Sequence, residues 1–181
     1  MKCFYTLLLM IVSVGCSSVK DYSDFDQYSD FVGACYKIKI DSYLYSLNYC
    51  MGEAGGCYSI QAFNANNVDM ELPQSWSELV SDESKWLTNI KYLARIGGSS
   101  PIEIGGFAKK GTKFKVRKIF NGDQGTLGKF WYISVEFEDP ILKNKNIFVP
   151  TPYQYLYPSW TKPSQLDQGP IWNDEFVEKC Q

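Results

Sequence analysis

Two alternating stretches, Lys113–Phe120 (KFKVRKIF) and Phe130–Glu138 (FWYISVEFE), indicate the fold class of this chain. A period of two is typical of a strand with one buried face. Asn121-Gly122, directly after the first stretch, is a hairpin signal. We therefore predict two strands joined by a turn. The residues that alternate onto a common face are Phe114, Val116, Lys118 and Phe120 in the first strand, and Trp131, Ile133, Val135 and Phe137 in the second.

Shorter β patterns lie on both sides of this hairpin. The alternation over 36–47 predicts one strand, or two strands bent at Asp41-Ser42, and a glycine-rich turn leads to a short strand over 58–63. Asp139-Pro140 marks a further turn before a strand over 147–149. Prolines cannot donate to a sheet ladder, so we expect the C-terminal tail to wrap the outside of the domain. These prolines are Pro150, Pro152, Pro158 and Pro163.

One helical insertion interrupts the β pattern, over about residues 75–96. Ser75 and Glu78 form a capping box, and apolar residues follow at helical spacing. Ser81-Asp82 could divide the segment into two shorter helices, and Gly97-Gly98 is expected to end it. The two tryptophans of this segment, Trp76 and Trp86, are expected to anchor the core rather than to contact a ligand.

The stretches IGGFAKKGTKFKVRKIF (104–120), GKFWYISVEF (128–137) and NIFVP (146–150) resemble the bacterial Src-homology-3-like barrel. In that fold a turn like Lys110-Gly111-Thr112 leads into a strand, and Asp41–Tyr45 is similar to the opening strand. The resemblance implies a mainly β fold, and the helix, which departs from the family pattern, adds one helical insertion (α+β). We therefore expect a small barrel that carries an inserted helix and a wrapping C-terminal tail. The resemblance also implies binding of peptide or cell-wall material on aromatic surfaces.

The first sixteen residues, MKCFYTLLLMIVSVGC, have a positive start, an uncharged run and small residues directly before Cys16. They resemble the signal and lipobox of bacterial lipoproteins. The resemblance implies that residues 1–15 are removed and that Cys16 carries the lipid that anchors the protein to the membrane of the cell envelope. In a Gram-negative host Ser17 would favour the outer membrane. An ordinary secretory signal is the alternative, whereas the apolar run is too short for a transmembrane helix, which needs about 20 residues.

Residues 16–34 are acidic, and the motif Tyr-Ser-Asp-Phe occurs twice in them, at 22–25 and 28–31. Because acidic polar segments rarely bury enough apolar surface to fold, we expect a tether there, with the doubled motif as a candidate docking peptide. A single β-rich domain would then occupy residues 35–181. That length is compatible with one core.

Histidine is absent and the net charge is −2, or −3 after loss of Lys2 with the signal. The absence of histidine removes the commonest general base and metal ligand, so we expect neither an enzyme nor a cofactor. Near-neutral charge argues against a nucleic-acid partner. A carboxylate-dependent hydrolase that uses Glu136 and Glu138 is a remaining alternative. The one basic cluster, expected on a solvated strand face or against an acidic partner, comprises Lys109, Lys110, Lys113, Lys115, Arg117 and Lys118.

Four cysteines besides Cys3 and Cys16 remain in the exported chain, namely Cys35, Cys50, Cys57 and Cys180. An even number in an oxidising compartment predicts two disulfides, for which three pairings are possible. We favour Cys50 with Cys57 and Cys35 with Cys180. Zinc is the alternative, but the four cysteines contain no CxxC spacing.

The tail sequence TPYQYLYPSW supplies the candidate binding residues Tyr153, Tyr155, Tyr157 and Trp160. Tyrosine and tryptophan are enriched at binding hot spots, although the same rings could instead cap the end of a barrel. Together these patterns predict a non-enzymatic, lipid-anchored binding protein whose partner is an envelope protein or cell-wall ligand. An immunity, inhibitor or exclusion lipoprotein that antagonises a toxin, a lytic enzyme or a phage is the alternative.

Overall fold

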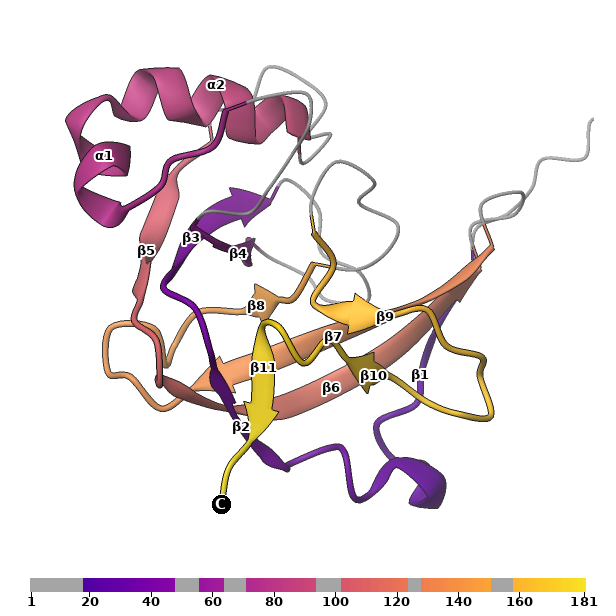
Figure 1. Cartoon of the computed structure of the whole chain (residues 1–181). Coiled ribbons are helices and arrows are strands. Elements are labelled where there is room, and N and C mark those ends of the chain that lie inside the picture. Colours follow the sequence, from indigo (N-terminus) through magenta and orange to yellow (C-terminus); the bar gives the residue numbers. More distant parts are fainter. Residues whose placement is uncertain (1–17, 48–55, 64–70, 94–101, 124–127, 151–157) are drawn as a thin grey trace, which may run out of the picture.

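The structure is a computed structural model that describes residues 18–47, 56–63, 71–93, 102–123, 128–150 and 158–181. It is mostly β, with two helices beside a curled, half-barrel sheet (Figure 1). The strands are β1 (Ser18–Asp21), β2 (Cys35–Ile38), β3 (Ser42–Leu47), β4 (Cys57–Ala62), β5 (Ile104–Ala108), β6 (Lys113–Asp123), β7 (Lys129–Phe137), β8 (Ile147–Phe148), β9 (Thr161–Lys162), β10 (Ile171–Trp172) and β11 (Val177–Lys179). The helices are the 3-10 turn η1 (Asp26–Tyr28), α1 (Trp76–Ser81) and α2 (Glu83–Leu93).

The predicted hairpin is the centre of the sheet, whose order is β11-β2-β6-β7-β8-β4-β3-β5. β6 and β7 pair antiparallel, from Phe114 opposite Phe137 to Asp123 opposite Lys129. A bulge between Val116 and Lys118 shifts the register. The expected alternation in β6 is therefore wrong after Val116, because a bulge moves the following side chains to the other face. Ile119, rather than Lys118, joins the inner core.

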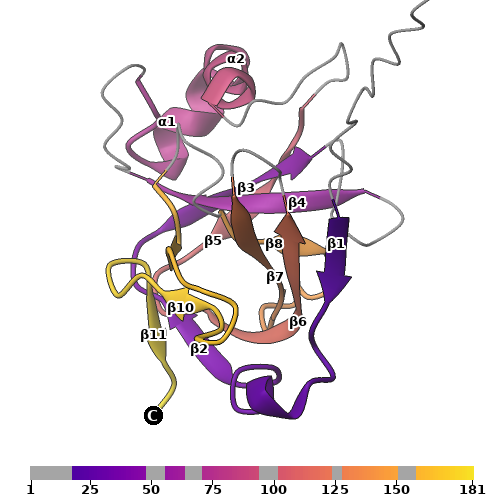
Figure 2. The ribbon, with the colours of Figure 1, turned by 90° about the vertical axis from the view of Figure 1, so that its right-hand side faces the viewer.

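The two larger hydrophobic cores lie on opposite faces of the strands, and a third, small cluster contains Cys57, Phe120, Tyr132 and Phe148. The inner core fills the half-barrel and contains Trp131, Ile133, Val135 and Phe137, which confirms that these residues share one face. The helix-side core lies between β3 to β5 and the two helices, which lie together on one side of the sheet in both views (Figures 1 and 2). β3 serves both cores, because Leu44 points inward whereas Tyr43 and Tyr45 point toward the helices.

The helical insertion consists of two helices rather than one. Ser75 caps α1 by accepting a hydrogen bond from the backbone N–H of Glu78 (3.2 Å), as the capping box predicts. Asp82 leaves the helical conformation and its carboxylate accepts a hydrogen bond from the N–H of Lys85 (3.2 Å). The break at Ser81-Asp82 is thereby confirmed. Gly97-Gly98 lies outside the described residues.

The prediction of a tether is wrong for residues 18–34. β1 pairs with β6, with Ser18 opposite Asp123. Both copies of the doubled motif are turns, since Phe25 N–H donates to Tyr22 (3.2 Å) and Phe31 N–H donates to Tyr28 (2.9 Å). Aromatic residues recur at three-residue spacing in this acidic segment, and three of the four, Tyr22, Tyr28 and Phe31, supply apolar area to the core, whereas Phe25 is exposed. Tyr28 is buried and Tyr22 and Phe31 pack against the inner core, so this segment is not a free docking peptide.

The C-terminal tail is only partly an outer wrap. As the prolines predict, no described residue of it forms a central strand: β9 and β10 form a separate pair, and β11 lies at the end of the main sheet beside β2. However, Trp160, Trp172 and Phe176 are buried in the inner core. The predicted disulfide Cys35–Cys180 is confirmed, with a Cα–Cα distance of 5.4 Å, and it joins β2 to the end of the chain.

Candidate functional site

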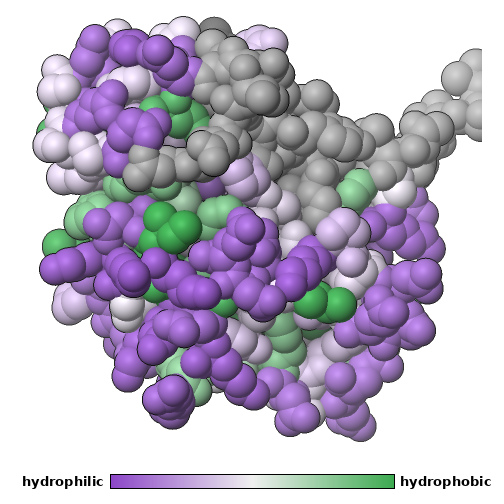
Figure 3. Space-filling model, viewed as in Figure 1, coloured by the Kyte–Doolittle hydropathy of each residue, from purple (hydrophilic) through white to green (hydrophobic). Residues whose placement is uncertain are grey.

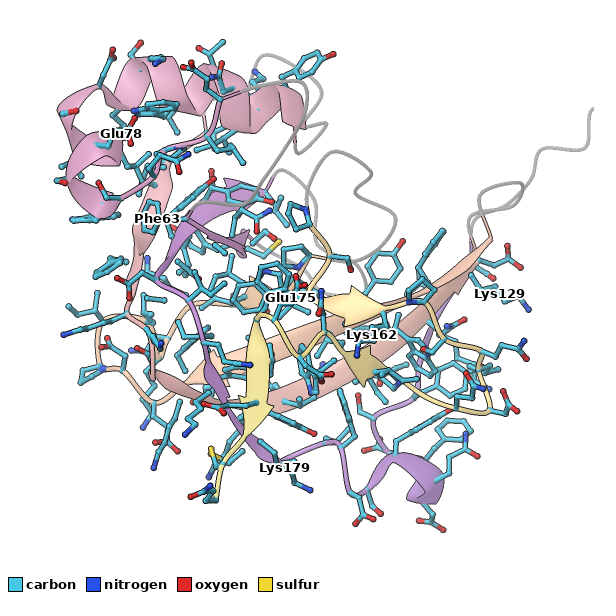
Figure 4. The ribbon with its side chains drawn as sticks, viewed as in Figure 1. Phe63, Glu78, Lys129, Lys162, Glu175 and Lys179 are labelled. Carbon is cyan, nitrogen blue, oxygen red and sulfur yellow. A yellow bond between two sulfur atoms is a disulfide. The ribbon has the colours of Figure 1, made fainter. Side chains whose placement is uncertain are left out.

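A cleft of about 550 Å³ lies where the half-barrel meets the start of α1. Its apolar lining comes from Ile40, Phe63, Trp76 and Phe107, which belong to four separate segments. On the face shown in Figure 3, hydrophobic surface is visible between the helices and the half-barrel, framed by hydrophilic residues. Figure 4 shows Phe63 beneath the helices on this side of the molecule. The polar lining residues are Lys39, Asp41, Gln74, Ser75, Ser77 and Lys110.

The aromatic wall of the cleft is built by packing between α1 and β5. Trp76 is the first residue of α1, and its ring stacks on Phe107 of β5 with a centroid separation of 5.5 Å. The ring centroids of Phe107 and Phe63 are 6.1 Å apart, and those of Phe63 and Tyr43 are 5.0 Å apart. Phe63 and Tyr43 are buried, whereas Trp76 and Phe107 stay half-buried. A rigid aromatic surface therefore continues from the helix-side core to solvent.

The polar side of the cleft is held by the turn between β5 and β6. Gly111 has a φ of +87°, a left-handed conformation that favours glycine. Its N–H donates to the carbonyl of Ile38 (2.8 Å), and the N–H of Lys110 donates to the carboxylate of Asp41 (2.6 Å). The predicted turn at Lys110-Gly111-Thr112 is thus confirmed, and it fixes the backbone of Lys110 at the cleft.

A second lysine of the cleft is tied to the C-terminal tail. The Lys39 ammonium donates to the backbone carbonyl of Asp174 (2.5 Å), and the Lys39 N–H donates to the carbonyl of Phe176 (2.8 Å). These two bonds connect the helix side of the molecule with the segment that closes the inner core. The cleft therefore combines a fixed aromatic wall with two lysine side chains.

The cleft lining combines aromatic rings with hydroxyl, amide and lysine side chains. Its lining contains a single carboxylate, Asp41, which already accepts the N–H of Lys110. Glycoside hydrolysis usually needs a pair of carboxylates, and the described lining residues supply one. Across the described residues, no group of three or more acidic or cysteine side chains is placed to hold a metal ion.

The candidate binding residues that were predicted in the C-terminal tail do not line the cleft where the structure describes them. Trp160 is 1 % exposed and stacks on Phe176 at 5.7 Å, so its prediction as a surface contact is wrong. Its indole fills the inner core because β9 folds the tail back over the half-barrel. The other tail candidates, Tyr153, Tyr155 and Tyr157, lie outside the described residues, as does Cys16.

Two further candidates are described only in part. Glu136 and Glu138 are exposed on and beside β7, away from the cleft lining. Cys57 is disulfide-bonded, and Cys50, its predicted partner, lies outside the described residues. The pairing of Cys50 with Cys57 therefore stays a prediction.

The cleft itself was missed by sequence reasoning: Trp76 was expected in the core, and Lys110 was singled out only in the predicted turn and in the basic cluster. Phe107 offered the clearest signal, because it is a lone aromatic between Gly105-Gly106 and Lys109-Lys110. Such a ring, flanked by glycines and lysines, is a candidate for partial exposure. Its neighbours in the cleft come from segments far apart in the sequence, and only the fold brings them together.

Comparison of the sequence with protein-family models and with curated proteins, and of the structure with solved structures, gives no match. Among the described residues, neither α1 nor α2 has the length and apolar character needed to cross a bilayer. Conclusions about function therefore depend on the residues and geometry of this chain alone.

Proposed function

We propose that this protein is a non-enzymatic, lipid-anchored binding protein of the bacterial cell envelope, and that it captures its partner in the cleft beside α1. The observation that carries the proposal is the stacked pair Trp76 and Phe107, which stays half-buried at the mouth of an aromatic-lined cleft. Large aromatic rings are enriched among the residues that dominate binding energy.

The cleft is preorganised, which lowers the entropic cost of binding. Trp76 is placed by a capped helix start, and Phe107 is placed by the pairing of β5 with β3, where it lies opposite Tyr43. The turn that carries Lys110 is fixed by two hydrogen bonds that its backbone N–H groups donate, one to the carbonyl of Ile38 and one to the carboxylate of Asp41. A partner would meet these groups already in position.

The location in the envelope is supported by two features that are independent of the cleft. The first sixteen residues resemble a lipoprotein signal that ends at Cys16. The disulfide Cys35–Cys180 is of the kind that persists in oxidising compartments such as the periplasm and the cell surface. Both features favour an exported protein held at a membrane by its lipid.

The finer proposal for the fold is a Src-homology-3-like barrel with inserted helices. The curled sheet and the turn at Lys110-Gly111-Thr112 support it. In this arrangement α1 and α2 cover the face of β3 to β5, so the partner would meet the barrel at the junction with α1 rather than on an uncovered sheet.

The binding proposal is tested by replacing the two half-buried rings. Trp76→Ala and Phe107→Ala should each reduce capture of the partner from an envelope extract about 30-fold, because hot-spot aromatics contribute about 2 kcal/mol or more. Tyr92→Ala is the matched control, since Tyr92 is 61 % exposed on α2 and does not line the cleft. Melting curves of all three variants show whether they remain folded.

Unchanged capture by both cleft variants would overturn the proposal, and so would an equal loss in the Tyr92 variant. The lipid anchor is tested separately by mass spectrometry of the protein from the envelope fraction. We expect a mature chain that begins with an acylated Cys16. A mature chain with a different first residue, or without acyl groups, would contradict the anchor and leave the cleft unaffected.

A further inference from the structure

The folded part of the chain begins almost at the proposed anchor. β1 starts at Ser18, two residues after Cys16, and Ser18 lies opposite Asp123 at the end of β6. Two residues of extended chain span at most about 7 Å. A lipid on Cys16 would therefore hold this end of the sheet directly beside the bilayer, with no tether between them.

We infer that the end of the sheet where β1 begins faces the membrane and that the cleft is held at the opposite end, open to the aqueous side. This inference rests on the proposed function, because it requires the lipid at Cys16. It assigns the membrane-facing end to three neighbouring positions on adjacent strands: Ser18, Asp123 and Lys129.

The length of β6 sets the distance between the anchor and the cleft. It runs eleven residues, from Lys113 beside the turn that carries Lys110 to Asp123 beside Ser18. At about 3.3 Å per residue this is about 33 Å when straight, and less in a curled sheet. Lys129 and Phe63 accordingly lie on opposite sides of the molecule in Figure 4. The separation is several times the reach of the two-residue attachment.

The exposed basic residues of β6 do not favour a domain that lies flat on an anionic bilayer. Lys115 is the cross-strand partner of Glu136, and the N–H of Glu138 donates to the carbonyl of Lys113 (2.9 Å). Two of the basic residues of β6 therefore have an acidic neighbour on β7 or directly after it, which weakens the positive field of this surface. At the membrane-facing end, Lys129 and Asp123 form an ion pair at 4.0 Å, so this end is balanced too.

The distance between the anchor and the cleft limits which ligands can reach the cleft. A ligand in the cleft must approach from the aqueous compartment, because a lipid headgroup of the anchoring leaflet cannot reach a site held this far from it. The aromatic wall of Trp76 and Phe107 would therefore meet a ligand presented by a soluble molecule or by an opposing surface, and the anchor would set the distance at which it is met.

The test uses the mature acylated protein, which begins at Cys16, in zwitterionic vesicles that carry a nitroxide on the lipid headgroup. A coumarin-bearing residue is placed at position 129 or at position 110 in separate samples. We expect quenching at position 129 to exceed quenching at position 110 several-fold. Equal quenching at the two positions, or stronger quenching at position 110, would overturn the orientation. Repetition in anionic vesicles at low and high salt shows whether the basic residues of β6 draw the domain down, which would also overturn it.

A second variant tests the cause of the orientation. Ten glycine and serine residues inserted between Ser17 and Ser18 should lower quenching at position 129 toward the value at position 110. Quenching unchanged by the insertion would overturn the role of the short attachment. Mass spectrometry of each sample separates the two proposals. Protein that lacks the acyl groups contradicts the proposed anchor, whereas acylated protein with equal quenching contradicts only the orientation.

Discussion

The inner core of the half-barrel and the helix-side core are built by different parts of the chain. Segments from both ends close the inner core, with Tyr28 from the start, Trp160 and Trp172 from the tail, and the disulfide Cys35–Cys180 between the two ends. The helix-side core is more local, because α1, α2 and β5 follow one another within residues 71–108. The cleft is lined by Phe63, Trp76 and Phe107 of the helix-side core, whereas Ile40 is the one described lining residue that packs against the inner core.

This contrast suggests a division of roles between stability and binding. Aromatic contacts hold the N-terminal segment on the inner core: the ring centroids of Tyr28 and Trp131 of β7 are 5.3 Å apart, and Phe31 stacks on Trp172 of the tail at 5.5 Å. Such pairs contribute about 0.5–1.5 kcal/mol each beyond the area they bury. In the helix-side core the outermost pair, Trp76 and Phe107, is left half-buried. The exposed parts of these two rings are apolar surface that a partner can contact.

The largest effect is expected from Phe114→Ala. Phe114 is fully buried, and its ring lies 5.4 Å from Phe137 and 5.7 Å from Trp172, where β6, β7 and the tail meet. Loss of the ring should lower the free energy of unfolding by about 3–5 kcal/mol, as measured by denaturant titration. Trp76→Ala should cost clearly less, because that ring is half-exposed. An equal loss in the two variants would contradict the contrast between the cores.

Removal of the disulfide should have the next largest effect. The bond closes 145 residues of sequence separation, so the double variant Cys35→Ala with Cys180→Ala should lower the free energy of unfolding by about 2–5 kcal/mol. Substitution is preferable to a reductant, which would also open the bond of Cys57. Trp76-dependent capture should persist in the double variant below its melting temperature. Loss of capture in the folded double variant would show that the cleft depends on the closure of the chain ends.

The elements with strong local periodicity could be predicted from the sequence. The β6 and β7 hairpin, the bend at Asp41-Ser42 and the divided helix all follow from patterns within a few residues. The bulge in β6 could not be predicted, because Lys118 and Ile119 are compatible with either face until β7 fixes the register. The prediction of a tether over residues 18–34 was wrong because it used the average composition of the segment, which is acidic, and not the regular spacing of its aromatic rings.

The candidate site could be predicted only in part. The turn around Gly111 was visible in the sequence, but its position beside Trp76 and Phe63 depends on how β3, β4 and β5 pair. Trp160 shows the opposite error, because an aromatic beside proline is compatible both with a surface contact and with a buried plug. Only burial in the folded chain distinguishes these two roles.

A smaller effect is expected where the two chain ends are joined by a hydrogen bond. The Tyr28 hydroxyl donates to the carbonyl of Leu166 (2.5 Å), and burial raises the pKa of this hydroxyl. Tyr28→Phe keeps the ring and removes the bond, so the free energy of unfolding should fall by about 0.5–1.5 kcal/mol. Tyr28→Ala should cost several times more. If the two variants were equally stable, the ring would contribute nothing and the segment would not belong to the inner core.

The smallest effect is expected at Asp174, which links the two regions. Lys162 donates to its carboxylate (2.9 Å), and this hydrogen bond, together with the charges of Lys162 and Lys39, lowers the pKa of Asp174. A carboxyl whose pKa is lower in the folded state stabilises the protein above its unfolded pKa of about 3.9, and this contribution is lost as the pH falls through the folded value. Wild type should therefore melt slightly above Asp174→Asn at neutral pH, and the gap should close as the pH falls below about 4.

The same variant separates the stability of the tail from binding in the cleft. Asp174→Asn keeps the backbone carbonyl that accepts a hydrogen bond from the Lys39 ammonium at the cleft. Capture should therefore be unchanged while the melting temperature shifts. Lys162→Gln is the matched control, since it removes the same ion pair from the other side and should show the same pH dependence. A gap that widened at low pH would contradict the stabilising role of the ionised carboxylate. A loss of capture in Asp174→Asn alone would show that the carboxylate serves the cleft rather than the tail.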